Sequence, residues 1–222
     1  MRCIHCGKII NGTYYTDWAG NTACTDCYNN SPRCVSCGQF CDSSAKDIDD
    51  GMMMCGHCQK YYMERSDARR MIEYINTIYE KEGLGRITNF HLKTANTKAL
   101  LSLSGNPQVR GLAKQHGTEY TIFVYRHLSR TAFANVLSHE MLHIWQYERN
   151  IQAENVLSEG FCNLGSYVVL TSIGTNRSIN FIRSMNANHD SIYGIGFRIM
   201  RSIYSANGWP GVIKKLTEKN NS

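Results

Sequence analysis

Apolar residues recur at spacings of three and four between positions 129 and 147, a pattern that predicts a buried helix. They are Phe133, Val136, Leu137, Met141, Ile144, Trp145 and Tyr147. Ser129 precedes the pattern, and a serine in that place can accept a hydrogen bond from a free N–H group of the first turn. We therefore expect a long helix that begins near Ser129 and lies in a hydrophobic core.

A second apolar pattern, from residue 156 to residue 170, predicts another buried helix. Its core-facing positions are Phe161, Leu164, Val168 and Val169. Ser158 is the expected N-cap, which would place Glu159 in the first turn.

The rest of the chain predicts an α+β fold that is mainly helical and has a short sheet. A helix is expected from Ser66 to about Gly83. Strands are expected at 86–93 and 120–126, and the second strand should end a hairpin that turns near His116 and Gly117. Residues 178–185 favour one more helix.

A last helical pattern follows, with Ile195, Ile199, Ile203 and Tyr204 as its apolar face. Asn207 and Gly208 should end this helix, and Pro210 should open a short final one.

The first of these helices carries the candidate chemistry, in the sequence His139-Glu140-Met141-Leu142-His143. Positions four apart on a helix lie on one face, so both imidazoles can reach one metal ion. Zinc bound there would lower the pKa of a water molecule, and Glu140 could take the proton as a general base. The plainer alternative is a helix with two ordinary histidines. Because the helix is apolar, however, burying these polar groups is costly unless they are paired or bind a metal.

A catalytic zinc site needs a third protein ligand, and the sequence offers two glutamates. A metzincin would carry glycine at position 146 and histidine at position 149, where this chain has Gln146 and Arg149. A carboxylate from the next helix is the remaining pattern, as in gluzincins, and we predict that Glu159 supplies it. Glu154, in the polar connection, is the alternative, and Glu159 could also simply stabilise the helix dipole.

Nine of the ten cysteines lie in residues 1–62, and eight of them form a repeat. Each copy has two Cys-x-x-Cys pairs, and the copies are Cys3, Cys6, Cys24, Cys27 and Cys34, Cys37, Cys55, Cys58. Four thiolates so spaced predict a tetrahedral Zn²⁺ site, so we expect two structural zinc ions in zinc-ribbon or LIM-like fingers. A disulfide framework is the alternative, and Cys41 is left over.

We expect a zinc-finger module at 1–62, a linker helix at 63–85 and a zincin-like metallopeptidase domain at 86–222. The formal charge of +6 comes from scattered lysines and arginines, which does not favour nucleic acid. There is no run of eighteen apolar residues and no basic-then-apolar leader. A cytoplasmic protein without membrane partners is therefore predicted.

Further polar residues are candidates for supporting roles. A hydrolase of this kind uses a hydrogen-bond donor to stabilise the oxyanion, and His189 and Tyr193 could each provide one, although a surface histidine and a core tyrosine are the plainer interpretations. Asn163, one turn after Glu159, could orient a metal ligand. Cys162 is either a packed thiol or one that could occupy the metal.

The order of these motifs resembles a known family. Tandem fingers are followed by TIFVYRHLSRTAFANVLSHEMLHIWQ, LSEGFCNLGSYVVL and SIYGIGFR. This arrangement is similar to the DA-one-like LIM peptidases, weakly in 63–105 and best across 120–200. The resemblance implies His139 and His143 as metal ligands, Glu140 as the catalytic glutamate, and Glu159 as the glutamate of the family's Glu-Gly element.

The resemblance also implies protein substrates and a ubiquitin or ubiquitin-like partner, because members of the family cut partner proteins and are activated by ubiquitin. Residues 193–198 match the family's Tyr-Gly-x-Gly-Phe-Arg segment. A LIM domain has fewer residues between its fourth and fifth metal ligands than this chain has between Cys27 and Cys34. It also has a histidine at the position of Cys24. Two separate ribbons therefore fit as well as one LIM unit.

These observations together predict a zinc endopeptidase with one catalytic and two structural zinc ions. The fingers would recruit substrates or partners, or regulate the catalytic domain. Two other functions remain open: a zinc-finger adaptor without turnover, and a DNA-associated metalloprotease.

Overall fold

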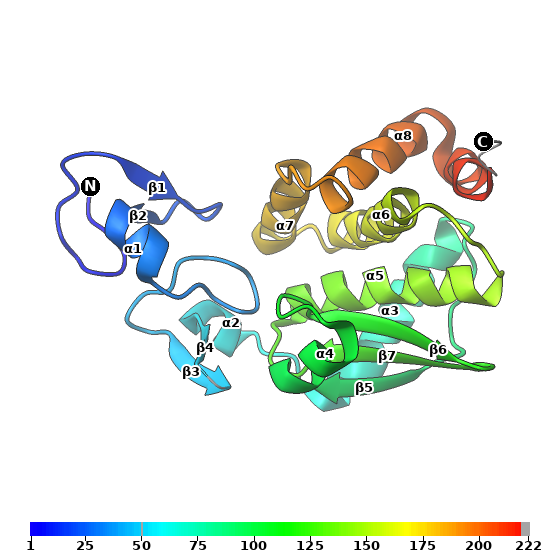
Figure 1. The fold of residues 1–222 in the computed structure, drawn as a ribbon, viewed down its shortest axis with the longest axis horizontal. Helices are drawn as coiled ribbons and strands as arrows, with labels where there is room; N and C mark the ends of the chain where they lie inside the picture. The colour runs from blue at the N-terminus through cyan, green and yellow to red at the C-terminus, as the bar shows by residue number, and fades with distance from the viewer. Residues whose placement is uncertain (50, 219–222) are drawn as a thin grey trace. The chain divides into compact units, whose positions relative to one another are not determined.

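The computed structural model describes residues 1–49 and 51–218, and it is α+β, about half helical with small sheets (Figure 1). The chain forms two compact units. One contains Met1–Glu64 and His127–Ala132, and the other contains Arg65–Arg126 and Phe133–Ser222. The second unit includes the helix that we expected to act as a linker.

The first unit consists of two similar fingers, each a short antiparallel hairpin followed by a short helix. In the first finger, β1 (Tyr14–Thr16) pairs with β2 (Thr22–Cys24), and α1 (Thr25–Asn30) follows. In the second finger, β3 (Lys46–Asp49) pairs with β4 (Met52–Met54), and α2 (Gly56–Lys60) follows.

The 31-residue repeat of the sequence is also a repeat of hydrogen bonds. Cys3 N donates to the Lys8 carbonyl at 2.9 Å, and Cys34 N donates to the Gln39 carbonyl at 2.9 Å. The turn after each first cysteine pair contains a glycine with positive φ, +70° at Gly7 and +72° at Gly38, a conformation that other residues rarely adopt. The two fingers therefore share one backbone design.

The first finger has little apolar interior. Its buried residues Cys3 and Ala23 form a cluster with Phe40 of the second cysteine copy, and a few partly buried neighbours pack against it. A core of this size contributes little stability, so metal binding is the expected source of folding free energy for the fingers.

The second unit contains a three-stranded sheet of order β5-β7-β6. β5 (His91–Ala95) runs parallel to β7 (Glu119–Tyr125), and β6 (Gly111–His116) is antiparallel to β7. The hairpin between β6 and β7 turns at Gly117, as predicted. β6 lies at an edge of the sheet, and this edge faces the candidate site.

The strand predicted at 86–93 begins later, at His91. Ile87 is fully buried, and its N–H and carbonyl bond to the side chain of Asn76 at 2.8 and 3.1 Å. Because one side chain satisfies both backbone groups, Ile87 is buried without a strand partner.

Helices make up most of the second unit. The short 3₁₀ helix η1 (Arg65–Asp67) leads into α3 (Ala68–Lys81), and α4 (Thr97–Ser104) lies between β5 and β6. The later helices are α5 (Arg130–Glu148), α6 (Asn155–Ile173), α7 (Asn176–Asn186) and α8 (Tyr193–Thr217). Figure 1 shows α5 between the sheet and α6. The helix predicted to follow Ser129 is therefore a central element of this unit.

Two glycines let α6 and α8 come into backbone contact. A Cβ atom on Gly160 would lie 2.3 Å from the carbonyl oxygen of Gly196, and a Cβ atom on Gly196 would lie 2.1 Å from that of Val156. Gly194 is restricted in the same way by the carbonyl of Asn188, at 2.1 Å. Gly196 thus permits close packing of α8 on α6, and Gly194 permits close approach of the connection between α7 and α8.

The start of α6 differs from the prediction. The helix begins at Asn155 with Glu154 as its N-cap residue, so Ser158 is not a cap. The Ser158 hydroxyl instead donates to Gln146 Oε1 on α5, at 2.9 Å. Glu159 is therefore in the second turn, where the helix dipole has less effect on it.

The prediction of which residues form the buried face of α8 is also partly wrong. Ile195 and Ile199 are 41% and 36% exposed, whereas Phe197 and Met200 are buried. The glycine contact with α6 sets the rotation of α8 and turns Phe197 inward. Gly208 has φ +60° and interrupts α8 before Pro210, as predicted.

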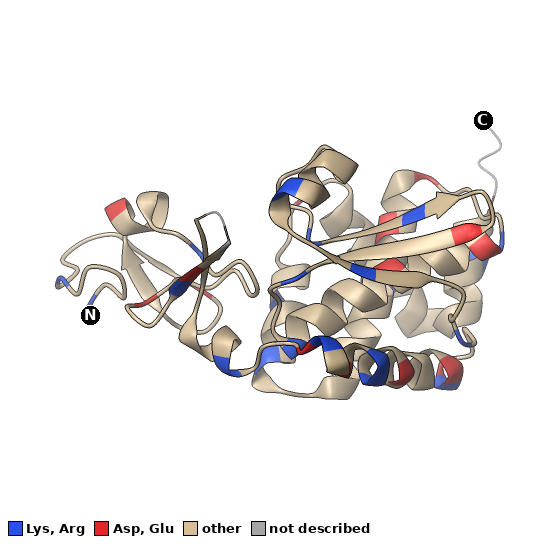
Figure 2. Cartoon of the chain, turned by 90° about the horizontal axis from the view of Figure 1, so that it is seen from below, with Lys and Arg blue, Asp and Glu red and all other residues tan. Residues whose placement is uncertain are grey.

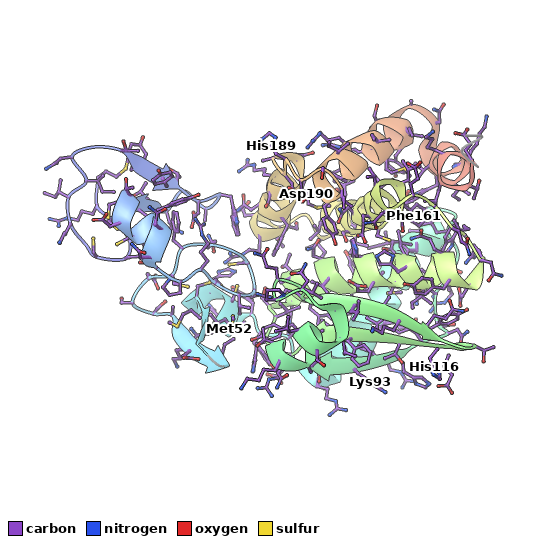
Figure 3. All side chains as sticks on the ribbon, viewed as in Figure 1. Met52, Lys93, His116, Phe161, His189 and Asp190 are labelled. Carbon is purple, nitrogen blue, oxygen red and sulfur yellow. The ribbon has the colours of Figure 1, made fainter. Side chains whose placement is uncertain are left out.

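By length and composition α6 would qualify as a membrane span, and half of the qualifying window is buried inside the unit. A buried core helix passes the same test. Its core residues include Phe161, Leu164 and Val169, all fully buried, and Figure 3 shows Phe161 on this helix. Basic and acidic residues are interspersed along the chain (Figure 2).

Candidate metal centre

Helices α5 and α6 bring three predicted metal ligands together. His139 Nε2 lies 3.2 Å from His143 Nε2 and 3.0 Å from Glu159 Oε2. His143 Nε2 lies 3.7 Å from Glu159 Oε1. The histidines are neighbours because they are one helical turn apart, whereas Glu159 reaches them only because α6 packs against α5.

These distances fit a tetrahedral zinc site. Zinc binds nitrogen and oxygen ligands at about 2.0–2.1 Å, which puts neighbouring ligand atoms roughly 3.3 Å apart. In addition, Glu159 Oε2 is buried and has no hydrogen-bond partner of good geometry among the described residues, although it lies close to His139. A buried carboxylate oxygen without such a partner is unfavourable, and a cation would relieve this cost.

The charges of the ligands are consistent with this arrangement. Burial by itself would raise the pKa of Glu159, but the close imidazoles of His139 and His143 lower it to about 2. Burial opposes the positive charge on His139, and Glu159 and Glu140 overcome that effect and raise its pKa. In the absence of metal, the carboxylate therefore attracts a proton to the place where a cation would bind.

Asn163 orients His139. Its Oδ1 lies 3.1 Å from His139 Nδ1, and its amide Nδ2 donates to the carbonyl of Tyr193 at 3.3 Å. Since Oδ1 can only accept, His139 Nδ1 must carry the hydrogen in this pair, which leaves a lone pair on Nε2 when the ring is neutral. Asn163 thus leaves Nε2 able to bind a metal ion.

Glu140 is buried beside the edge strand of the sheet. Its Oε2 accepts a hydrogen bond from the backbone N–H of Ala113, at 2.8 Å. Gly111, two residues earlier in β6, lies so close that an added Cβ atom would be 2.7 Å from Glu140 Oε1 and 2.4 Å from Val136 Cγ1. Strand β6 therefore fixes the glutamate from the side opposite to α6.

A cavity of about 370 Å³ opens at this site. His139, Glu140, Asn163 and Tyr193 contribute to its wall, together with Asn106, Gln108, Val109, Arg110, Gly111, Asn135, Val136 and Ser166. The wall combines α5, α6, the start of α8 and the loop before β6.

Of the two predicted hydrogen-bond donors, only Tyr193 lines this cavity. Burial raises the pKa of Tyr193, and the carboxylates of Glu159 and Glu140 raise it further, so its hydroxyl keeps its proton. His189 is exposed in the connection between α7 and α8 and is not part of the cavity wall (Figure 3). Glu154, the alternative ligand, is exposed at the N-terminus of α6.

A buried thiol lies behind the histidines. Cys162 Sγ and one nitrogen of each of His139 and His143 all lie within 4.8 Å of one another. Cys162 is fully buried and accepts a hydrogen bond from Gln146 Nε2 at 3.2 Å. Burial raises its pKa, as do the charges of Glu159 and Glu140. The same two histidines therefore have two possible partners, a carboxylate and a thiol.

The eight finger cysteines form two separate four-cysteine groups that can each hold a metal ion. Cys37 Sγ and Cys55 Sγ are 3.9 Å apart, close to the roughly 3.8 Å expected for two sulfurs on one zinc and far above a disulfide length. Backbone N–H groups point at equivalent sulfurs, from Cys24 to Cys3 at 3.5 Å and from Cys55 to Cys34 at 3.3 Å.

Cys41 belongs to neither group. It is buried, and burial raises the pKa of its thiol to about 12, an effect that the neighbouring thiols Cys34 and Cys55 reinforce. Nine cysteines in a short segment thus divide into two metal-ligand sets and one packed thiol.

Gly111, Ala113 and Arg110 were not anticipated as site residues. A glycine inside a strand often marks close approach of another group, and this was the one available signal for Gly111. The N–H of Ala113 belongs to the backbone, so no feature of the side chain could have indicated its role.

No model of a known protein family, no curated protein and no solved structure matches this chain. Its function must therefore be argued from the geometry of the site.

Proposed function

We propose that the protein is a zinc-dependent endopeptidase whose catalytic metal binds His139, His143 and Glu159. The observation that carries this proposal is the convergence of three ligand residues, with distances of 3.0–3.7 Å between the two Nε2 atoms and the carboxylate oxygens of Glu159, next to a buried glutamate on the wall of a cavity. Three protein ligands leave one position for water, the arrangement typical of catalytic zinc.

Each residue has a distinct task in the proposed reaction. Bound zinc supplies a Lewis acid that lowers the pKa of water and polarises a peptide carbonyl. Glu140 accepts a proton from the attacking water and passes it to the leaving amine, and the bond from Ala113 holds its carboxylate in place. The Tyr193 hydroxyl donates a hydrogen bond to the oxyanion.

The fingers are proposed to recruit protein substrates or partners, or to regulate the catalytic unit. The resemblance to DA-one-like LIM peptidases supports protein substrates and suggests ubiquitin, or a ubiquitin-like protein, as a partner to test first. Basic and acidic side chains are mixed over the described part of the chain, a distribution that does not favour nucleic acid (Figure 2).

The first experiment measures zinc content and protease activity in the same preparations. We expect three zinc ions per chain, falling to two in Glu159→Ala, and cleavage of an unfolded protein such as casein. Glu140→Gln should retain three zinc ions and lose at least about a hundredfold in rate, because it removes the general base and leaves the ligands intact. Unchanged cleavage in zinc-loaded Glu140→Gln would refute the assigned role.

Cys162 favours one other function, a zinc-binding adaptor without turnover. If the thiol bound the metal together with both histidines and Glu159, four protein ligands would close the site to water. Cobalt substitution separates the two cases, because a thiolate ligand produces a charge-transfer band in the near ultraviolet. After correction for the finger sites with Cys162→Ala, a residual band would favour the adaptor.

A further inference from the structure

The wall of the active-site cavity is polar and has only one permanent cation. Four carboxamides line it, Asn106, Gln108, Asn135 and Asn163, and only Val109 and Val136 are aliphatic. The charged side chains in the wall are Glu140 and Arg110, besides His139. Glu140 has the role of general base in the proposed reaction. Arg110 is therefore the charged side chain that can select for a charge on a peptide bound in the cavity.

Arg110 is held by its backbone and by one end of its guanidinium. Its carbonyl accepts a hydrogen bond from Tyr125 N at 2.8 Å, which joins it to β7. Both bonds of the guanidinium come from Nη1, to the carbonyl of Pro107 at 3.0 Å and to that of Val109 at 3.1 Å. The guanidinium also lies over the ring of Tyr125, 5.5 Å from its centre.

The other edge of the guanidinium is free. Nη1 has two hydrogens and makes two bonds, whereas Nε and Nη2 have no acceptor among the residues that the structure describes. Nε–H and Nη2–H point in nearly parallel directions and form the edge that binds both oxygens of a carboxylate.

No carboxylate of the described chain pairs with Arg110, although the side chain is half-buried. Burial lowers the pKa of Arg110, and Tyr125, over whose ring the guanidinium lies, only partly opposes this effect. A partly desolvated cation without a counterion is costly, and an anion from outside the chain would reduce that cost.

Resting on the function proposed above, we propose that Arg110 binds a carboxylate of the peptide substrate close to the scissile bond. The carboxylate comes from an acidic side chain or from the C-terminus of the peptide. Arg110 directly precedes Gly111, whose backbone is packed against Glu140, so the bound anion and the reacting bond share one cavity. The enzyme should therefore prefer acidic sites, or the ends of chains, over neutral sites.

The test uses quenched fluorescent peptides that are cleaved at one bond. Glu and Gln are exchanged at each position next to that bond, and a free C-terminus is exchanged for an amide. We expect kcat/KM to be at least about tenfold higher for the carboxylate member of one pair, from a charge-assisted bidentate bond. In Arg110→Gln this ratio should fall towards one, and in Arg110→Lys it should be intermediate, because lysine keeps the charge without the paired donors.

Two controls make the result specific. Arg69→Gln removes an exposed arginine of α3 and should leave the ratio as it is in the native protein. Because the ratio compares two peptides on one variant, a general loss of stability in Arg110→Gln cancels. The affinity of each peptide for zinc-loaded Glu140→Gln, measured by fluorescence anisotropy, should show the same preference without turnover.

A Glu preference assigns the site to an acidic side chain, and a free-acid preference assigns it to the C-terminus. Equal affinities within every pair, a preference that persists in Arg110→Gln, or no binding of any carboxylate peptide would overturn the proposal. Arg110-dependent binding without cleavage by the native protein would instead refute the peptidase function. The two failures are therefore distinguishable.

Discussion

The missing side chain of Gly111 determines where the carboxylate of Glu140 lies. The glycine allows β6 to approach α5 closely enough for the N–H of Ala113 to bond Glu140 Oε2. To act as the general base proposed above, Glu140 must be held at a defined distance from the attacking water, so this backbone contact is as important to the proposal as the carboxyl group itself.

Gly111→Ala tests this contact. Its Cβ atom would meet Val136 and Glu140 at less than 3.0 Å, and overpacking of this kind costs about 1–3 kcal/mol. We expect peptidase activity to fall by at least about tenfold with three zinc ions retained, because the base moves while the ligands stay. Zinc analysis and thermal unfolding accompany the rate measurement, and native activity in the variant would exclude the contact as a determinant.

Asn163→Ala removes the side chain that orients His139. Loss of such a partner typically costs 10–100-fold in metal affinity, and we expect that decrease at the catalytic site only. Competition with a zinc chelator measures it, with the two finger ions as an internal reference. Thr171→Ala, an exposed position of the same helix, is the matched control. Equal zinc affinity in both variants would remove Asn163 from the site.

At the scale of elements, the candidate centre depends on how α6 packs. One side of α6 contacts α5, and the other contacts α8 through Gly160 and Gly196. Glu159 directly precedes Gly160 in the chain. A change in how α6 packs against α8 would therefore also move Glu159, the third proposed ligand.

Gly160→Ala should therefore separate α6 from α8 and displace Glu159. The added Cβ atom would meet backbone atoms of Gly196, which cannot move aside as a side chain can. We expect a loss of at least about 2 kcal/mol in unfolding free energy, together with weaker zinc binding at the catalytic site. Urea unfolding measures the first effect. Gly12→Ala, where an added Cβ meets nothing within 4 Å, should change neither property.

At the scale of the molecule, the two units should depend on zinc to different degrees. The fingers contain few buried apolar residues, whereas the second unit has a large core around α5 and α6. Zinc removal is therefore expected to unfold the fingers and to leave the second unit largely folded.

Cys37→Ser should lose one zinc ion and the amide protection of the second finger, while the hydrogen exchange of α5 and α6 stays slow. Cys41→Ala is the matched control, because Cys41 is equally buried but lies outside both four-cysteine groups. Hydrogen exchange and zinc analysis test both variants. Loss of zinc in Cys41→Ala, or global unfolding in Cys37→Ser, would contradict this division.

Local rules were sufficient where the relevant groups are close in sequence. The 31-residue cysteine repeat specified the two four-cysteine groups, because each Cys-x-x-Cys pair forms half of a site. The period of an α-helix specified that His139 and His143 share a face. Periodicity also located α5, and turn and helix-ending residues located the β6–β7 hairpin and the break at Gly208.

Local rules failed where a distant segment supplied the partner. Ser158 was predicted to cap α6, but its hydroxyl instead donates a hydrogen bond to Gln146 of α5. Ile195 and Ile199 were predicted to form the apolar face of the last long helix, but the glycine contact with α6 leaves both side chains exposed. The late start of β5 has the same cause, since Asn76 bonds the backbone of Ile87.

The sequence by itself thus determined the types of donor atoms and their local spacing: eight cysteines in two sets, and two histidines with a glutamate on one helix. Only the tertiary structure decided that Glu159 rather than Glu154 joins the histidines, that Tyr193 rather than His189 lines the cavity, and that Arg110 and Cys162 lie beside the site. The physical reason is that ligand spacing within a helix follows from backbone geometry, whereas contacts between helices and strands depend on packing across the whole unit.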